Sequence, residues 1–256
     1  MHVYVISLAD AAARRGDIVR QLEAAGLPFT IFDAVDGRAL GADELARCYD
    51  GDAARRQYRD MSRGEIGCAL SHLGVYRRLL EEGRPWALVL EDDAQLGERL
   101  PAVLRALEDA LDAGRPDVTL LTHVDKYTRH GARRLDQTHR LVRRYGDWWL
   151  AHGYVVTRAA AQRMLEALRP VRTAADSWAR FERQGIVALR AVVPYCIGLS
   201  PRAADSTLQE HRAEFMREAR ERRGWRYYLY MYGYRRFVHQ IVVRPFLRVA
   251  RQKKAP

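Results

Sequence analysis

Three consecutive carboxylates, Glu91, Asp92 and Asp93, follow directly after an apolar run at residues 87–90. An apolar run of this kind predicts a buried strand, so the acids lie where that strand ends. Like charges placed side by side repel, and each loses hydration when it is even partly buried. A bound cation would resolve both problems, because Mg²⁺ and Mn²⁺ prefer carboxylate oxygens as ligands.

The chemistry that such a site supports is the departure of a diphosphate. Ligands of an open parallel sheet bind outside the carboxyl ends of its strands, and a divalent cation there can neutralise the charge on a leaving phosphate. The spacing of Glu91 and Asp93 is that of the acidic element of nucleotide-sugar transferases. The alternative is a solvated turn that caps the next helix. A second acidic pair, Asp50 and Asp52, follows no apolar strand, and we interpret it as a turn.

The elements that must position these acids alternate between strands and helices, which predicts an α/β fold. Ser62 and Glu65 have the spacing of a capping box, so a helix is expected to begin there. Residues 130–147 are polar and irregular, and we expect a loop or a hairpin. We predict strands at 2–9, 28–37, 86–90, 117–124, 148–157 (one strand or a pair) and 186–195, and helices at 9–26, 41–51, 62–83, 99–114, 158–168 and 176–185.

Composition argues against several classes of protein. The chain has 256 residues and a hydrophobic fraction of 48%, which is ordinary for a globular protein. Its three cysteines show no metal-binding spacing, which argues against a disulfide scaffold and for a reducing compartment. We find no signal peptide at the N-terminus and no window near the roughly 18 apolar residues of a membrane span. We therefore expect a soluble or peripheral protein.

Positive charge is concentrated at the C-terminus. From Arg212 onward, 13 arginines and lysines face three glutamates, which accounts for most of the net charge of +11. We place a domain boundary near Pro201, between a domain at 1–200 and a basic, aromatic, helical tail at 201–256. The tail can lie on an anionic membrane surface, pack on the body of the protein, or bind nucleic acid. We favour the membrane surface and expect no nucleic acid partner.

The stretch around the acids extends the argument to a family. Residues 61–96, MSRGEIGCALSHLGVYRRLLEEGRPWALVLEDDAQL, closely resemble glycosyltransferase family 25, which includes bacterial lipooligosaccharide and lipopolysaccharide galactosyltransferases and relatives of collagen galactosyltransferases. Further matches, in the family's order, are YVISLADAAARR, FDAVDGRAL, HGYVVTRAAAQRML and TAADSW. The resemblance covers about Val3 to Ser200, whereas CIGLSPRAADSTLQ and LLTHVDKY depart from the family's pattern.

The resemblance implies a GT-A type fold, with a Rossmann-like mixed sheet flanked by helices. It also implies a UDP-sugar donor, most often UDP-galactose, inversion at the anomeric carbon, and Mn²⁺ or Mg²⁺ as cofactor. Glu91, Asp92 and Asp93 would then form the donor and metal site, with Asp93 as the direct metal ligand. The other donor-binding positions that match the family's motifs are Ser7, Leu8, Arg14 and Arg15 near the nucleotide, and Ala34, Val35, Asp36 and Gly37 around the uridine.

Two pairs of side chains have both a functional and a structural interpretation. Glu65 and His72 are seven residues apart and share one flank of their helix. Given the resemblance, we expect them to face the cleft; the alternatives are a cap for Glu65 and a packed histidine for His72. Trp148 and Trp149 can form a platform on which a sugar stacks, or they can be part of the core.

An inverting transfer needs a general base that takes the proton of the acceptor hydroxyl. Asp176 is the best matched carboxylate for this role and Asp125 is the second candidate. The alternative for Asp176 is an N-cap of the helix that follows it. His211 is a candidate for a further metal ligand.

Taken together, these features predict a metal-dependent, inverting galactosyltransferase. Its acceptor would be a lipid-linked oligosaccharide of the lipopolysaccharide or lipooligosaccharide core, at the cytoplasmic face of the inner membrane. Alternatives are a family member that uses another UDP-hexose or a protein acceptor, and a non-catalytic basic protein that binds membranes or nucleic acid.

Overall fold

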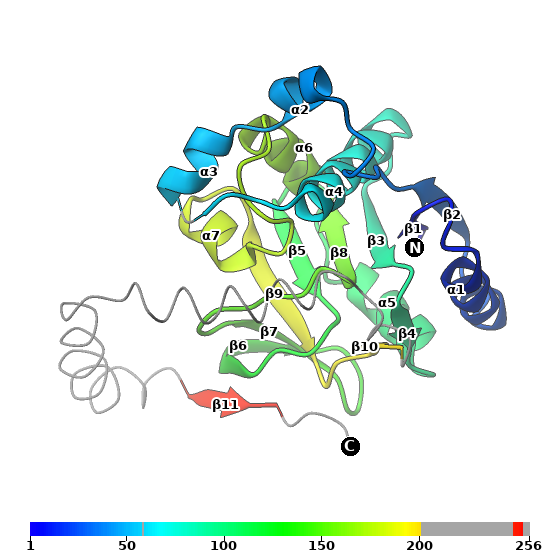
Figure 1. The fold of residues 1–256 in the computed structure, drawn as a ribbon. Coiled ribbons are helices and arrows are strands. Elements are labelled where there is room, and N and C mark those ends of the chain that lie inside the picture. Colours follow the sequence, from blue (N-terminus) through cyan, green and yellow to red (C-terminus); the bar gives the residue numbers. More distant parts are fainter. Residues whose placement is uncertain (58, 201–247, 253–256) are drawn as a thin grey trace, which may run out of the picture.

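A computed structural model describes residues 1–57, 59–200 and 248–252 of the chain (Figure 1). The helices are α1 (Ala12–Ala24), α2 (Ala42–Cys48), α3 (Gly51–Gln57), α4 (Arg63–Glu81), α5 (Leu100–Glu108), α6 (Arg158–Ala167) and α7 (Trp178–Arg183). The strands are β1 (Val3–Ser7), β2 (Phe29–Asp33), β3 (Trp86–Glu91), β4 (Ala94–Leu96), β5 (Asp117–Leu120), β6 (Lys126–Arg134), β7 (Arg140–Arg144), β8 (Gly153–Thr157), β9 (Ala188–Val193), β10 (Ile197–Leu199) and β11 (Val249–Arg251).

Nine strands form one mixed sheet in the order β11-β6-β7-β9-β5-β8-β3-β1-β2. The strands β2, β1 and β3 are parallel, as the βαβ opening of the chain predicts. β8 then pairs antiparallel with both β3 and β5, which makes the sheet mixed. The predicted α/β class, with a mixed sheet flanked by helices, is confirmed.

Apolar side chains on both faces of the sheet build two cores. Alternate residues of β1 point to opposite faces, so Tyr4 belongs to one core and Val5 to the other. The first core packs the sheet against α4, α6 and α7, and the second packs it against α1 and α5. A central strand that is buried on both faces is expected to be apolar throughout, and β1 is buried at all five positions.

The structure differs from the sequence-based elements in several places. Asp50 caps the first turn of α3 by accepting the backbone N–H of Ala53 (2.8 Å), so the interpretation of Asp50 and Asp52 as a turn is wrong. The strand expected from residue 148 begins only at Gly153, because Leu150 has φ = 76°, which a strand cannot accommodate. The short strands β4 and β10 pair with each other and had no sequence signal, since three residues show no alternation.

The irregular segment at 130–147 lies largely in the antiparallel pair β6 and β7, which confirms the hairpin alternative. Residues 249–251 form strand β11 beside β6 instead of the expected helix. The remainder of the predicted tail, 201–247 and 253–256, lies outside the described residues, and the domain boundary near 201 stays a prediction. Within the described part of the chain, no helix is long and apolar enough to cross a membrane.

Candidate active site

The acidic run lies where the parallel strands end. Glu91 is the last residue of β3 and is level with Ile6, so the acids after it meet the end of β1. Ser7 donates its hydroxyl to Asp92 Oδ2 (2.7 Å), and Arg14 Nη1 lies 3.5 Å from Asp92 Oδ1. Burial raises the pKa of Asp92, and the Ser7 hydrogen bond and the Arg14 charge oppose this rise. The structure thus brings together three of the predicted donor-site residues.

Arg15 ties the ends of the first two strands together. Its Nη2 donates to the carbonyl oxygens of Ser7 (3.2 Å) and Leu8 (3.3 Å). The same nitrogen lies 2.7 Å from Asp33 Oδ1, at the end of β2. Arg15 therefore shapes the loop after β1, and Arg14 is the arginine of the pair that reaches the acids.

The segment 34–37 packs tightly against α4. The N–H of Ala34 donates to the Ser7 carbonyl (2.9 Å), and the N–H of Val35 donates to Ser71 Oγ (2.8 Å). A Cβ on Gly37 would lie 1.8 Å from the Arg63 carbonyl oxygen. The loop therefore requires glycine where it crosses the helix.

We expect Gly37→Ala to lower the free energy of unfolding by more than about 2 kcal/mol, because backbone atoms cannot give way to the new methyl group. Gly16→Ala is the control, since the new Cβ in α1 would meet only the flexible end of Arg20 at 3.6 Å. That change is expected to stabilise the helix by about 0.5–1 kcal/mol. Urea unfolding of both variants measures the difference, and equal stability of the two would show that the loop can move away.

Asp93 is the acid whose buried negative charge is least offset by nearby groups. Burial, followed by the negative charges of Glu91 and Asp92, raises the pKa of Asp93 to about 7. Its Oδ1 is buried and has no hydrogen-bond partner among the described residues. Its backbone carbonyl accepts the N–H of Ser200 (2.8 Å), which brings β10 beside the acids. An unpartnered, buried carboxylate oxygen beside two other acids fits a divalent cation.

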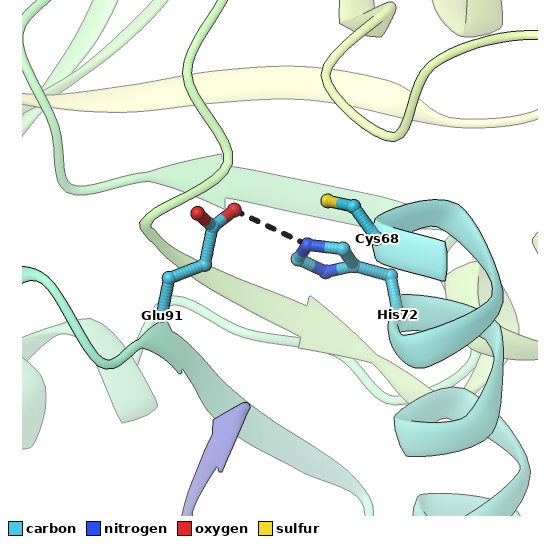
Figure 2. Close-up of side chains that lie close together, drawn as sticks. All are labelled: Cys68, His72 and Glu91. Atoms are coloured by element: carbon cyan, nitrogen blue, oxygen red, sulfur yellow. Dashed lines mark hydrogen bonds and ion pairs between the residues drawn. The ribbon is translucent and has the colours of Figure 1, made fainter. Parts of the chain in front are cut away.

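Glu91 points toward α4, where it meets His72 (Figure 2). His72 Nε2 lies 3.3 Å from Glu91 Oε1, and His72 Nδ1 lies 2.7 Å from the Tyr154 hydroxyl. The ring is almost fully buried, with 2% of its surface exposed. His72 is therefore both a packed, hydrogen-bonded histidine and a neighbour of the acids, so the two interpretations of this residue are compatible.

A cavity of about 500 Å³ lies beside these residues. Glu65, Glu91 and Asp176 contribute carboxylates to its lining, and Trp149 contributes an aromatic face. Trp149 is 53% exposed, whereas Trp148 is buried and donates its Nε1–H to the Lys126 carbonyl (2.8 Å). Each interpretation of the tryptophan pair thus applies to one residue: Trp148 belongs to the core, and Trp149 faces the cavity.

The structure distinguishes the two candidates for the general base, Asp176 and Asp125. Asp176 is 9% exposed and lines the cavity. Helix α7 has Ser177 as its N-cap residue, so Asp176 does not have the capping position. Asp125 does not line the cavity; it is 66% exposed and lies 3.7 Å from Lys126 Nζ, so its place as second candidate is not supported. His211 lies outside the described residues.

Glu65 combines its two expected roles. It completes the capping box of α4, accepting the Ser62 N–H (2.9 Å) and donating its own N–H to Ser62 Oγ (3.3 Å), and it also lines the cavity. Its Oε2 accepts Arg59 Nη1 (2.8 Å). Burial raises the pKa of Glu65, but the Arg59 and Ser62 hydrogen bonds outweigh burial, so the pKa lies below its usual value.

A carboxylate with a lowered pKa stabilises the fold above its unfolded pKa, and this contribution is lost as pH falls through the folded value. Glu65→Gln keeps the capping box but loses the charge. We expect the variant to be less stable than wild type by about 1 kcal/mol near pH 7, with the difference disappearing at a pH below the lowered pKa of Glu65. Urea unfolding of both proteins over a series of pH values from 7 downward tests this. Glu81→Gln, at the exposed end of α4, is the control and should change stability by less than about 0.5 kcal/mol.

The sequence model of glycosyltransferase family 25, described as an LPS biosynthesis protein family, matches residues 1–179. The chain belongs to glycosyltransferase family 25. Every predicted site residue except His211 lies within the matched range. The resemblance noted from the sequence is confirmed.

Curated relatives from animals and bacteria match part of this family 25 chain. A "Glycosyltransferase 25 family member" of Aedes aegypti is 31% identical over 175 residues, covering 64% of this chain and 28% of the relative. Human "Procollagen galactosyltransferase 2" is 28% identical over 171 residues, covering 64% of this chain and 27% of the relative. "Lacto-N-neotetraose biosynthesis glycosyltransferase LgtB" of Neisseria meningitidis serogroup B is 33% identical over 132 residues, covering 51% and 46%. The matched region thus spans less than half of each relative.

Four arginines that the sequence reasoning did not single out also line the cavity of this family 25 protein: Arg59, Arg172, Arg180 and Arg183. Arg59 is paired with Glu65, and Arg183 lies 3.4 Å from Asp147. Arg180 and Arg183 lie beyond the family match. Arginine is abundant throughout the chain, so only the fold distinguishes these four from the rest.

Proposed function

We propose that this family 25 protein is a metal-dependent, inverting glycosyltransferase that moves a hexose, with galactose the first candidate, from a UDP-sugar to an oligosaccharide acceptor. The observation that carries the proposal is the single cavity that Glu91, Asp176 and Trp149 share at the carboxyl end of β3. A cavity of about 500 Å³ has the size of a small-molecule site. Its mixture of acids, arginines and one exposed aromatic face suits a sugar and its phosphates.

In this proposal the UDP-sugar donor binds where strands β1 and β3 end. A divalent cation bound at Asp93 would neutralise charge on the diphosphate of the donor. Asp93 suits that role because its buried Oδ1 has no hydrogen-bond partner in the described part of the chain. Arg14 lies close enough to pair with Asp92, and it adds positive charge at the same end of the sheet. Trp149 offers the apolar face of its indole to the hexose ring.

The transfer moves one proton, forms one bond at the anomeric carbon and breaks another. The Asp176 carboxylate takes the proton of the acceptor hydroxyl as the hydroxyl oxygen attacks the anomeric carbon. The bond between that carbon and the phosphate oxygen breaks on the opposite face, and UDP leaves with the bonding electrons. Attack from the face opposite the leaving group inverts the anomeric centre. This role is supported by the position of Asp176 in the cavity lining and by the burial of most of its surface.

The proposal also names the class of acceptor. The family's description as an LPS biosynthesis protein, together with a relative named for lacto-N-neotetraose biosynthesis, supports an oligosaccharide of the lipopolysaccharide or lipooligosaccharide core as the proposed acceptor. The basic residues from Arg212 onward would bring the protein to the anionic inner face of the cytoplasmic membrane. Relatives named procollagen galactosyltransferase keep a protein acceptor as the alternative.

Release of UDP from a panel of UDP-sugars, with Mn²⁺ or with EDTA, tests this function. We expect slow hydrolysis of one UDP-sugar with Mn²⁺, faster release when a core oligosaccharide is added, and none with EDTA. Release of UDP from the UDP-sugar that is stimulated by a collagen peptide mixture but not by the oligosaccharide would favour the protein acceptor. If no UDP-sugar is turned over with any acceptor, the proposed function is wrong.

A further inference from the structure

A second group of ligand atoms lies close to the acids and has a different chemistry. Cys68 and His72 are four residues apart on α4 and therefore share one face of that helix, which Glu91 approaches from the end of β3 (Figure 2). The Cys68 sulfur, a ring nitrogen of His72 and a carboxylate oxygen of Glu91 all lie within 4.8 Å of one another. Asp93 is not a member of this group.

The ligand types select a class of metal. Mg²⁺ and Mn²⁺ are bound mainly by oxygen, whereas a thiolate together with an imidazole favours zinc and related transition ions. Two ligands at about 2.0–2.1 Å from a tetrahedral zinc ion lie about 3.3 Å apart. His72 Nε2 and Glu91 Oε1 are already at 3.3 Å. A thiolate and a carboxylate together balance the two charges of the ion.

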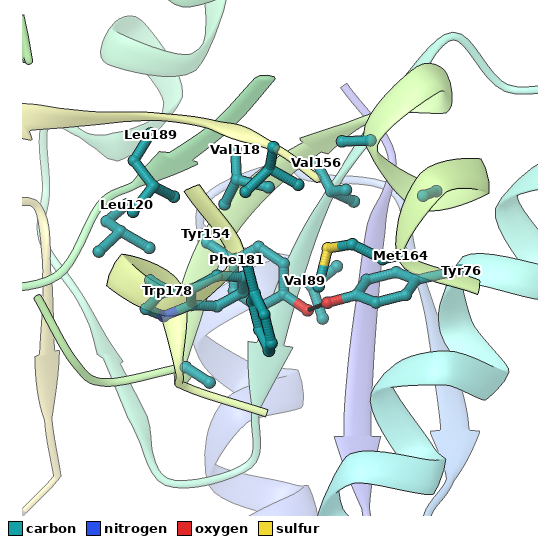
Figure 3. Close-up of a cluster of buried hydrophobic side chains, with 14 of the residues drawn as sticks. Tyr76, Val89, Val118, Leu120, Tyr154, Val156, Met164, Trp178, Phe181 and Leu189 are labelled. Atoms are coloured by element: carbon teal, nitrogen blue, oxygen red, sulfur yellow. Dashed lines mark hydrogen bonds between the residues drawn. The ribbon is translucent and has the colours of Figure 1, made fainter. Parts of the chain in front are cut away.

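The surroundings of His72 support a metal on its Nε2. Metal-bound histidines usually give their other N–H to a fixed acceptor, which orients the ring. His72 Nδ1 lies 2.7 Å from the Tyr154 hydroxyl, which in turn lies 2.6 Å from the Tyr76 hydroxyl (Figure 3). Nδ1–H can thus donate to Tyr154 and Tyr154 to Tyr76, which leaves Nε2 free to bind the metal.

The group is open on one side. Cys68 and Glu91 line the cavity of about 500 Å³, whereas His72 is buried behind them. Three protein ligands and one open position are typical of zinc sites that act on a substrate or bind an exogenous ligand. We propose that Cys68, His72 and Glu91 bind a thiophilic divalent transition ion, zinc above all, whose fourth position faces the cavity. This site is distinct from the Asp93 position, and its occupancy does not depend on sugar transfer.

Cobalt binding to the reduced full-length protein tests the site, because a thiolate bound to Co²⁺ gives a charge-transfer band in the near ultraviolet and tetrahedral Co²⁺ gives visible bands. We expect both bands to saturate at one Co²⁺ per chain, to disappear when Zn²⁺ is added, and to persist in excess Mn²⁺. Cys68→Ser should remove the charge-transfer band and weaken Zn²⁺ binding at least tenfold. Cys48→Ser is the matched control, because Cys48 lies on α2 outside the group, and it should keep both bands.

Two further measurements keep the test decisive. Asp93→Asn should keep the cobalt bands, which separates this site from the one proposed for the donor. Should Cys68→Ser fail to fold, as judged by circular dichroism, zinc protection of wild-type Cys68 against alkylation replaces it, with Cys48 as the internal control. Absence of the charge-transfer band in wild type, its loss in Cys48→Ser or Asp93→Asn, or equal alkylation of Cys68 with and without zinc would each overturn the proposal. None of these outcomes bears on whether UDP-sugars are turned over.

Discussion

Asp93→Asn is expected to raise the melting temperature of the protein in EDTA while it abolishes sugar transfer. The carboxylate is buried, stands beside Glu91 and Asp92, and has an oxygen without a partner in the described residues, so the fold is more stable without its charge. We expect a rise of about 2–5 °C. Turnover of the UDP-sugar should fall at least about a hundredfold, since the proposed cation would lose its ligand.

Differential scanning fluorimetry in EDTA and a UDP-release assay in Mn²⁺ measure the two effects. Asp125→Asn is the control, because this aspartate is exposed and outside the cavity, and it should change neither quantity. A variant at Asp93 that is both less stable and fully active would contradict the account, since it would show that the buried carboxylate serves the fold and not the cation.

Asp176→Asn is expected to lower kcat by about 10²- to 10⁴-fold, the usual contribution of a general base. Asparagine has nearly the same shape but cannot take the proton of the acceptor hydroxyl. Binding of UDP should be unchanged, because Asp93 and Arg14, which are proposed to act on the diphosphate, do not line the cavity that Asp176 lines. Steady-state kinetics and UDP-dependent thermal stabilisation of the same preparation separate the two effects. Full activity of Asp176→Asn would assign the base to another residue, and a loss of UDP binding would make Asp176 a donor-binding residue.

Features that depend on neighbouring residues were predictable from the sequence. The acids at the end of β3 follow an apolar run, and Ser62 and Glu65 show the spacing of a capping box, so both features appear within a few residues of sequence. The contact between Ser7 and Asp92 follows from a general property of parallel sheets, whose strand ends meet at one edge. The expectation that Ser7 and Arg14 belong to the donor site came from the family resemblance, and this property of the sheet is its physical reason.

Features that depend on distant contacts were not predictable in the same way. The pairing of His72 with Glu91 requires the register between α4 and β3, which no local pattern specifies. The need for glycine at position 37 arises from the Arg63 carbonyl, which is far from it in sequence. The exposures of Trp148 and Trp149 differ although the two are adjacent, because Trp148 packs in the first core and donates to the Lys126 carbonyl, whereas Trp149 lines the cavity. Such contacts emerge only once the helices and the sheet are packed together.

The central claim is that the acidic end of β3 holds a divalent cation and, with it, a uridine diphosphate. The most direct test is the thermal stabilisation of wild type and Asp93→Asn by UDP, each with Mn²⁺ and with EDTA. A ligand at about 100 times its Kd stabilises the folded state by about 2.7 kcal/mol, which gives a clear shift in Tm. The account predicts this shift only for wild type with Mn²⁺. The same UDP shift in EDTA or in Asp93→Asn, or no shift under any condition, would contradict it.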